Sequence, residues 1–262
     1  MGGEIAFIGT RDTWARWRSL FEEKSFSLHL VDGVDALPIE DLDTRISEAV
    51  GKRYSSAIFT SKNSVKILMS SSIGKGFVES LYSEGSLLVS IGEGTAEMLR
   101  SHGYRSFTPP IERISIAISI IGSAIRPRGR IAVLSSDKLD LGFGGVLDSL
   151  EIDHIKVYRL VMREEGVEII RHLVERGVRS FIVASQTASE LLVKAVTMGY
   201  RDSLDTAIEV HAMSSRVARP LIERGLGDRL RVIIYESPTF REFMLNIIEK
   251  IAGQAGNLGT LE

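Results

Sequence analysis

Ser90-Ile91-Gly92-Glu93-Gly94-Thr95-Ala96-Glu97-Met98-Leu99, followed by Gly103, occurs a second time later in the chain. The second copy is Ala212-Met213-Ser214-Ser215-Arg216-Val217-Ala218-Arg219-Pro220-Leu221, followed by Gly225. Each copy joins an apolar run to a helical pattern through small polar residues, as a strand that feeds an N-capped helix does. The segment therefore predicts a strand and helix unit that the chain uses twice.

Two further pairs of segments repeat at nearly the same distance. Glu4-Ile5-Ala6-Phe7-Ile8 matches Arg130-Ile131-Ala132-Val133-Leu134, and Phe59-Thr60-Ser61-Lys62-Asn63-Ser64 matches Val183-Ala184-Ser185-Gln186-Thr187-Ala188. Three collinear matches are typical of a duplicated chain. Because a duplicated chain of this size usually forms two similar lobes, we expect a cleft between them that binds a small polyanion.

Short apolar runs alternate with helical patterns along the whole chain, which predicts α/β lobes with parallel sheets. A helix is expected through Trp14, Trp17 and Phe21, with the tryptophans used for packing, and a second, buried helix over 114–125. The expected strands are too many for one sheet and therefore indicate two: 5–8, 27–31, 57–59, 87–91, 131–134, 155–158, 180–184, 208–212 and 232–235.

Charge and composition argue against several classes of function. The 262 residues include 32 basic and 34 acidic residues, without a long run of either sign, which disfavours binding to nucleic acid or to a membrane surface. The sequence has no cysteine, so disulfides, thiolate metal sites and cysteine nucleophiles are excluded. No apolar run is long enough for a membrane span or a signal peptide, and we expect a cytoplasmic protein.

The familiar cofactor motifs are missing. Gly142-Phe143-Gly144-Gly145 lacks the spacing of a dinucleotide fingerprint, and no Walker sequence occurs. The histidines show neither an i, i+4 pair nor an HExxH segment, so they are expected at the surface, solvated or hydrogen-bonded. We therefore expect no cofactor and no metal.

Polar side chains follow four of the expected strands. These segments are Thr60-Ser61-Lys62-Asn63-Ser64, Gly92-Glu93-Gly94-Thr95, Ser185-Gln186-Thr187 and Ser214-Ser215-Arg216. Open α/β sheets bind ligands at the carboxyl ends of their strands, where free N–H groups at helix starts attract carboxylates and phosphates. The alternative is that each serine or threonine is only an N-cap.

In order and spacing, several segments resemble the uroporphyrinogen-III synthase family over the chain up to about Ile251. They are Phe59-Thr60-Ser61-x-Asn63-x-Val65, Ser90-Ile91-Gly92-x-Gly94-Thr95-Ala96, Val157-Tyr158-Arg159, the strand that ends at Ser185, and Glu236-Ser237-Pro238-Thr239. The resemblance implies two flavodoxin-like lobes joined by a two-stranded linker. One lobe would hold 1–35 and 161–255, the other 38–156, and 256–262 would be a disordered tail.

The resemblance also implies an activity and a site. The family's enzymes are cofactor-independent lyases that convert hydroxymethylbilane, a linear tetrapyrrole with eight carboxylates, into uroporphyrinogen III with loss of water and inversion of the last ring. Tyr158 would assist the departing hydroxyl or orient the first ring; the alternative is an aromatic residue at a strand end that only packs at the hinge. The cleft residues carried over from the family are Thr60, Ser61, Gly92, Thr95 and Ser185, to which the polar strand ends add Asn63, Gln186, Ser214 and Ser215.

Two departures from the family pattern extend the expected site. The Gly-x-Thr-Ala common in the second half is here Ser214-Ser215-Arg216-Val217-Ala218, and the usual Arg-Gly after the middle strand is Ser135-Ser136-Asp137-Lys138. Two interpretations follow: Arg216 and Lys138 bind substrate carboxylates instead, or the cleft has diverged from that of the family. The alternative functions are a non-catalytic tetrapyrrole- or anion-binding regulatory module and a two-lobed solute-binding protein. The enzyme is expected to be a monomer with a transient contact to hydroxymethylbilane synthase.

Overall fold

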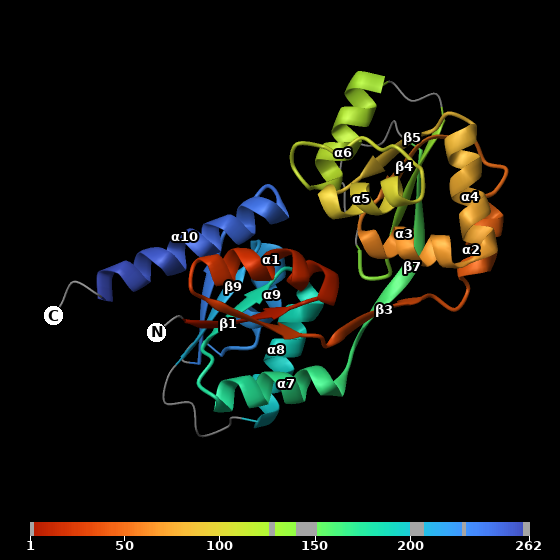
Figure 1. The fold of residues 1–262 in the computed structure, drawn as a ribbon. Coiled ribbons are helices and arrows are strands. Elements are labelled where there is room, and N and C mark those ends of the chain that lie inside the picture. Colours follow the sequence, from red (N-terminus) through yellow and green to blue (C-terminus); the bar gives the residue numbers. More distant parts are fainter. Residues whose placement is uncertain (1–2, 126–128, 140–150, 200–206, 227–228, 259–262) are drawn as a thin grey trace. The chain divides into compact units, whose positions relative to one another are not determined.

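The computed structural model describes residues 3–125, 129–139, 151–199, 207–226 and 229–258. The chain divides into two compact units, which are drawn in Figure 1. Unit 1 combines Met1–Asp35 with Val161–Glu262, and unit 2 is Ala36–Leu160. Each unit has its own five-stranded sheet with helices packed against it, which confirms the predicted α/β class and its two sheets.

Unit 1 is built on a parallel sheet with the strand order β10-β9-β8-β1-β2. In chain order this is the flavodoxin-like arrangement 2-1-3-4-5. Its elements are β1 (Glu4–Ile8), α1 (Arg11–Glu23), β2 (Ser27–Val31), α7 (Glu164–Glu175), β8 (Ser180–Val183), α8 (Gln186–Gly199), β9 (Ile208–Ala212), α9 (Ser215–Glu223), β10 (Leu230–Ile234) and α10 (Phe240–Leu258).

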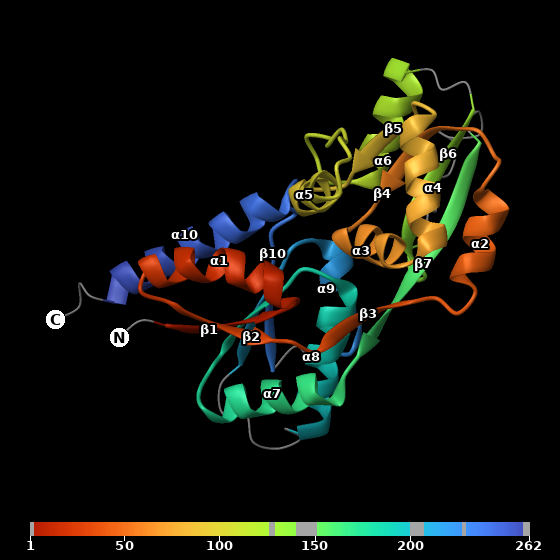
Figure 2. The same ribbon diagram turned by 45° about the vertical axis from the view of Figure 1, so that its right-hand side comes forward.

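Alternation along the strands divides the core of unit 1 between the two faces of the sheet. Ile5 and Phe7 pack with residues of α1 and α10, whereas Ala6 and Ile8 pack with α7, α8 and α9. Figure 2 shows these two helical layers on either side of the sheet. Trp17 is buried with this core, in agreement with the predicted packing role. A strand covered on both faces reads as a continuous apolar run, which explains the sequence of β1.

Unit 2 has the strand order β3-β7-β6-β4-β5. One face is covered by α2, α3 and α4, and the other by the apolar helix α6. The elements are β3 (Val34–Pro38), α2 (Leu42–Ala49), β4 (Tyr54–Phe59), α3 (Lys62–Ser70), α4 (Ser72–Ser83), β5 (Leu87–Ser90), α5 (Glu93–Ser101), α6 (Ile114–Ile120), a π-helical turn (Ile121–Ile125), β6 (Arg130–Ser136) and β7 (Ile152–Met162).

The two sheets repeat one plan, as the sequence repeat predicts. β1 lies between β8 and β2, and β6 lies between β4 and β7 in the same way. The outer neighbours β9 and β5 also correspond. Beyond β9 stands the full strand β10, whereas beyond β5 only Phe107 forms a parallel bridge, with Val89. The duplicated halves therefore differ at this edge, and they also differ at the other, where β3 has no counterpart beyond β2.

The strands β3 and β7 carry the chain between the units and are neighbours in the sheet of unit 2. Arg163 N donates to Gly33 O at 2.9 Å, and Ile39 N donates to Val157 O at 3.3 Å. Because one residue number rises as its partner falls, the pair is antiparallel. The apolar pattern did not predict β3, whose short run contains Asp35 and ends at Pro38, but the family resemblance implied a two-stranded linker, which β3 and β7 form. Proline suits this strand because it lies at the edge of the sheet.

The helical region predicted over 114–125 is present as α6 and the π-helical turn. At the carboxyl end, α10 extends to Leu258, so residues 256–258 of the expected tail are helical, and 259–262 lie outside the described residues. Within the part of the chain that the structure describes, no helix is long and apolar enough to cross a membrane.

Candidate functional site

The carboxyl edge of the unit 2 sheet brings Thr60 and Ser61 to the end of β4. The Thr60 backbone N–H and hydroxyl both donate to Leu134 O, at 3.1 and 3.0 Å, which fixes this residue to β6. Ser61 is the N-cap of α3, and its hydroxyl oxygen accepts from Ser64 N at 3.4 Å. The cap accepts rather than donates, so the Ser61 hydroxyl hydrogen remains available for a second partner.

That second partner is Tyr158 on β7. The Ser61 and Tyr158 hydroxyl oxygens are 2.8 Å apart, and either group can donate. Burial raises the pKa of the Tyr158 phenol, while its hydrogen bonds with Ser61 and Ser136 act in the opposite direction. Tyr158 is only 5% exposed. The phenol is therefore held protonated and oriented at the sheet edge, which is the state a proton donor needs.

An irregularity in the β6 and β7 ladder sets the direction of these side chains. The register shifts between Ser135 and Ser136, so that Ser135 pairs with Lys156 but Ser136 pairs with Tyr158. Bulges of this kind are common beside active sites, where they redirect a side chain. Tyr158 is a site residue expected from the sequence, whereas Ser136 is not, although Ser136 lies in the segment that departs from the family pattern.

Gly92 and Thr95, at the start of α5, are occupied by contacts within unit 2. Thr95 is 3% exposed, and its hydroxyl donates to Ile91 O at 3.1 Å. Gly92 has a φ of 90°, and a Cβ at this position would lie 3.0 Å from the carboxylate carbon of Glu112. The positive φ favours glycine here, whereas the Glu112 side chain could move away from a Cβ. A carboxylate of the chain itself thus lies at this helix start.

The two remaining predicted residues of unit 2 lie near the same edge. Asn63 is half-buried in the first turn of α3, and Lys138 is exposed two residues beyond the end of β6. The segment around Lys138 continues into 140–150, outside the described residues, where the Gly142 to Gly145 sequence also falls.

In unit 1 the predicted residues gather at the starts of α8 and α9. Ser185 accepts from Ala188 N at 3.2 Å, and Ser214, the N-cap of α9, accepts from Val217 N at 3.4 Å. Arg216 Nε donates to Gln186 Oε1 at 3.4 Å and so joins the two helix starts. These serines therefore cap helices, as the alternative interpretation predicted, and their ligand-binding role stays a prediction.

The carboxylate of Glu236, which the sequence placed in a family segment but not among the site residues, lies at the start of α9. Ser215 N donates to Glu236 Oε1 at 2.7 Å, and the Ser215 hydroxyl donates to the same oxygen. Glu236 has a φ of 45°, a backbone conformation that is uncommon for residues other than glycine. Because α5 and α9 are equivalent in the repeat, Glu112 and Glu236 lie beside corresponding helix starts. Helix N-termini favour negative charge, which explains both placements.

One histidine contradicts the expectation that all five lie at the surface. His211 is completely buried in β9, with Nε2 3.0 Å from Ser180 Oγ and Nδ1 2.8 Å from Tyr235 OH. Burial lowers the pKa of His211 to about 4. A neutral imidazole can donate through one nitrogen and accept through the other, so both neighbours are satisfied in the core.

Among the described residues, no cluster of His, Cys, Asp and Glu side chains could hold a metal ion.

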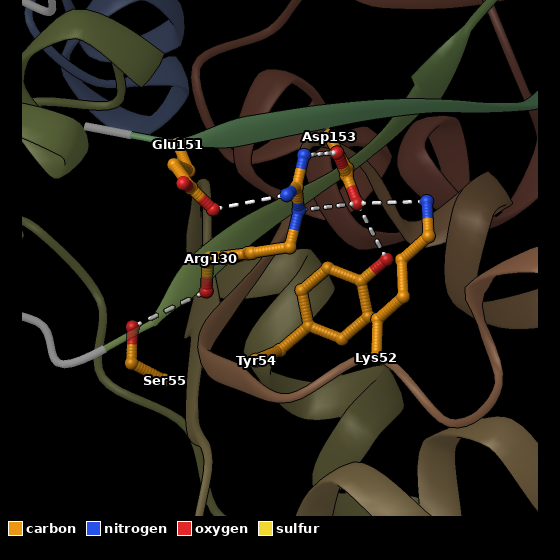
Figure 3. A network of polar contacts seen from close by, with 6 residues as sticks. All are labelled: Lys52, Tyr54, Ser55, Arg130, Glu151 and Asp153. Atoms are coloured by element: carbon orange, nitrogen blue, oxygen red, sulfur yellow. Dashed lines mark hydrogen bonds and ion pairs between the residues drawn. The ribbon is translucent and has the colours of Figure 1, made fainter.

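The densest ionic network lies at the opposite, amino edge of the unit 2 sheet (Figure 3). Asp153 accepts from Arg130 Nη2 at 2.6 Å through one oxygen, and from Arg130 Nε, Tyr54 OH and Lys52 Nζ at 3.0, 2.9 and 3.2 Å through the other. Glu151 adds a contact of 2.9 Å to Arg130. Because the residues join the beginnings of β4, β6 and β7, we interpret the network as a structural clamp.

Comparisons with known proteins identify the family. The sequence model described as uroporphyrinogen-III synthase HemD matches residues 19–240. None of the curated proteins compared with the chain matches it. A mutant uroporphyrinogen III synthase from the extremely thermophilic bacterium Thermus thermophilus is 17% identical with a TM-score of 0.57, covering 97% of this chain and 100% of that one. Uroporphyrinogen-III synthetase from Helicobacter pylori is 14% identical with a TM-score of 0.55, covering 95% and 99%.

These structures share the two-lobed fold, and the family match confirms the resemblance found in the sequence. The match includes β4, β5, β7 and β8, the strands that precede or carry most of the predicted site residues. This chain belongs to the uroporphyrinogen-III synthase family.

Proposed function

We propose that the chain is a uroporphyrinogen-III synthase, a cofactor-independent lyase that cyclises hydroxymethylbilane with loss of water and inversion of ring D. The observation that carries this proposal is the family match over 19–240. Tyr158 at the carboxyl edge of unit 2 supports it, because its hydroxyl is buried, oriented by Ser61 and kept protonated.

Tyr158 is the proposed donor to the hydroxyl leaving group. The C–O bond of the hydroxymethyl group breaks while the electron-rich pyrrole ring supplies electrons to the exocyclic carbon. A phenol whose pKa is raised stays protonated at neutral pH and can donate as negative charge develops on the leaving oxygen. Ser61, itself fixed as the cap of α3, restricts the direction of this donor.

Helix starts are the proposed binding points for the substrate carboxylates. α3 and α8 begin after Ser61 and Ser185, and their first N–H groups and dipoles favour anions without a strong base nearby. Arg216 and Lys138 add positive charge in units 1 and 2, respectively. Uncatalysed closure gives the uninverted isomer, so the enzyme's principal task is to hold the chain in the geometry that inverts the last ring.

An isomer assay tests the proposed function. The purified chain is incubated with hydroxymethylbilane without added metal or nucleotide, and the oxidised porphyrins are separated by chromatography. A predominance of the type III isomer is the expected result. If the product equals the type I mixture of a control without enzyme, the proposal is wrong, and the non-catalytic binding module becomes the better account.

The finer expectations about assembly and location are part of the proposal. A monomer, a transient contact with hydroxymethylbilane synthase and a cytoplasmic location remain predictions. Light scattering of the purified chain, alone and mixed with that synthase, measures the first two.

A further inference from the structure

Asp137 carries a carboxylate oxygen that has no hydrogen-bond partner in the described part of the chain. The residue directly follows β6, at the same sheet edge as Tyr158. Its Oδ1 is buried and makes no hydrogen bond to any of the residues that the structure describes. Leaving a buried carboxylate oxygen unpaired is unfavourable, so such a group in a folded protein calls for a functional explanation.

The backbone places this carboxylate beside the proposed proton donor. Asp137 N donates to Tyr158 O at 2.8 Å, immediately after the register shift at Ser136. The negative charge of Asp137 also contributes to the raised pKa of the Tyr158 phenol. Tyr158, Ser61, Ser136 and Asp137 therefore form one cluster in unit 2, with hydroxyl donors and a single acceptor of full negative charge.

We propose that Asp137 is a further catalytic residue of the synthase reaction, whose Oδ1 accepts the N–H of the pyrrole ring that loses the hydroxyl group. This inference rests on the proposed function. The group that Asp137 would bind is the N–H of a pyrrole ring. This ring becomes cationic during the reaction, since its nitrogen shares the positive charge once the C–O bond has broken.

The step balances without any added reactant. The C–O bond breaks with its electron pair on oxygen, and the Tyr158 proton converts the leaving group to water. Ring electrons form the exocyclic carbon–carbon double bond, and the positive charge on the N–H ring is balanced by the negative charges of Asp137 and the tyrosinate. The substituted α-carbon of the last ring attacks the exocyclic carbon first and forms a spiro intermediate without losing a proton. Its old bond to the methylene bridge then breaks, and the free α-carbon of the same ring bonds to that bridge carbon. This second carbon loses its proton, which restores the Tyr158 phenol.

A carboxylate is a poor ground-state ligand for a substrate with eight carboxylates. Its hydrogen bond with the ring N–H is strongest while the cation exists, which is the condition for accelerating the chemical step rather than tightening binding. Asp153 provides the contrast in the same unit, because both of its oxygens are paired within the protein.

The test compares Asp137→Asn with the wild type and with Asp153→Asn as a matched control. Asparagine keeps the shape of Asp137 but removes its charge. We expect kcat to fall by about 10- to 100-fold, with KM changed by less than about threefold and no decrease in Tm. Asp153→Asn is expected to lower Tm and leave kcat per folded molecule unchanged.

The outcomes separate this inference from the proposed function. If the wild type makes no type III isomer, the proposed function fails. An active wild type together with Asp137→Asn at more than half of its kcat, or with a loss confined to KM, would overturn the catalytic role. Asp137→Ser provides the same comparison if the asparagine variant does not fold. Failure of both variants to fold would also overturn it, because the carboxylate would then be required for stability.

Discussion

The hydroxyl oxygens of Ser61 and Tyr158 lie 2.8 Å apart, which links the cap of α3 to the β7 strand across the carboxyl edge of unit 2. The Ser61 hydroxyl thus caps α3 and also forms a hydrogen bond with the Tyr158 phenol. This relationship makes the position of the proposed proton donor depend on the first turn of α3.

Tyr158→Phe should lower kcat by about 10- to 100-fold, because it removes a donor whose contribution is made mainly in the transition state. Ser61→Ala should cost about 1 kcal/mol of unfolding free energy through the lost cap, and it should lower kcat less than Tyr158→Phe does. Steady-state kinetics and urea unfolding of both variants provide the measurements. Full activity of Tyr158→Phe would make this residue a packing group only.

Thr95→Val separates a binding role from a structural one. The Thr95 hydroxyl is buried and donates to Ile91 O, so we expect a loss of about 1 kcal/mol in unfolding free energy and little change in kinetics per folded molecule. Val217→Thr, at the equivalent place in the repeat, serves as the control. A tenfold rise in KM for Thr95→Val would instead support carboxylate binding at this helix start.

Asp153 should make the protein sensitive to acid. Its hydrogen bonds with Arg130 hold the pKa of the carboxyl below its ordinary value of 3.8. The resulting stability is present above pH 3.8 and is lost as the pH falls through the folded-state pKa. Asp153→Asn should cost about 2 kcal/mol at pH 7. The difference from wild type, measured by denaturant unfolding, should shrink below pH 3.8, and a constant difference would contradict the clamp.

His211 should make the free energy of unfolding depend on pH in a second, higher pH range. Its pKa is about 4 in the folded protein against an ordinary 6.5, so its contribution is complete above pH 6.5 and is lost as the pH falls toward 4. Relative to pH 7.5, the wild type should lose about 2 kcal/mol more at pH 5 than His211→Gln does. Unfolding curves at both pH values test this, and parallel losses in the two proteins would exclude His211 as the cause.

The sequence predicted those features that depend on local patterns. Buried strands such as β1 appear as apolar runs, and the repeat predicted the common plan of the two sheets. β3 was missed because five residues with an aspartate and a proline carry almost no strand signal. The burial of His211 depends on Ser180 and Tyr235, which are distant in the sequence.

In the candidate site, too, residues recognisable from a local pattern could be predicted, whereas those that depend on distant residues could not. The helix caps could be identified from sequence, since their residue types and their place after a strand are informative, whereas Tyr158 was identified through the resemblance of Val157-Tyr158-Arg159 to the family. Glu236 could not, because its role depends on meeting Ser215 through space. Asp137 is similar: an unpaired oxygen is a property of the surrounding residues and leaves no mark in the sequence.

The chain passes from unit 1 to unit 2 at β3 and returns at β7, and this affects the order in which the units can fold during synthesis. Unit 2 is one continuous segment and can fold as soon as it leaves the ribosome, whereas β1 must wait for β8, its partner at Ile5 and Ser180. At about 5–20 residues per second, this wait lasts roughly 10 to 35 seconds. During that time β1, α1 and β2 are without three of the five strands of their sheet, so we expect the newly made amino-terminal segment to need chaperones most.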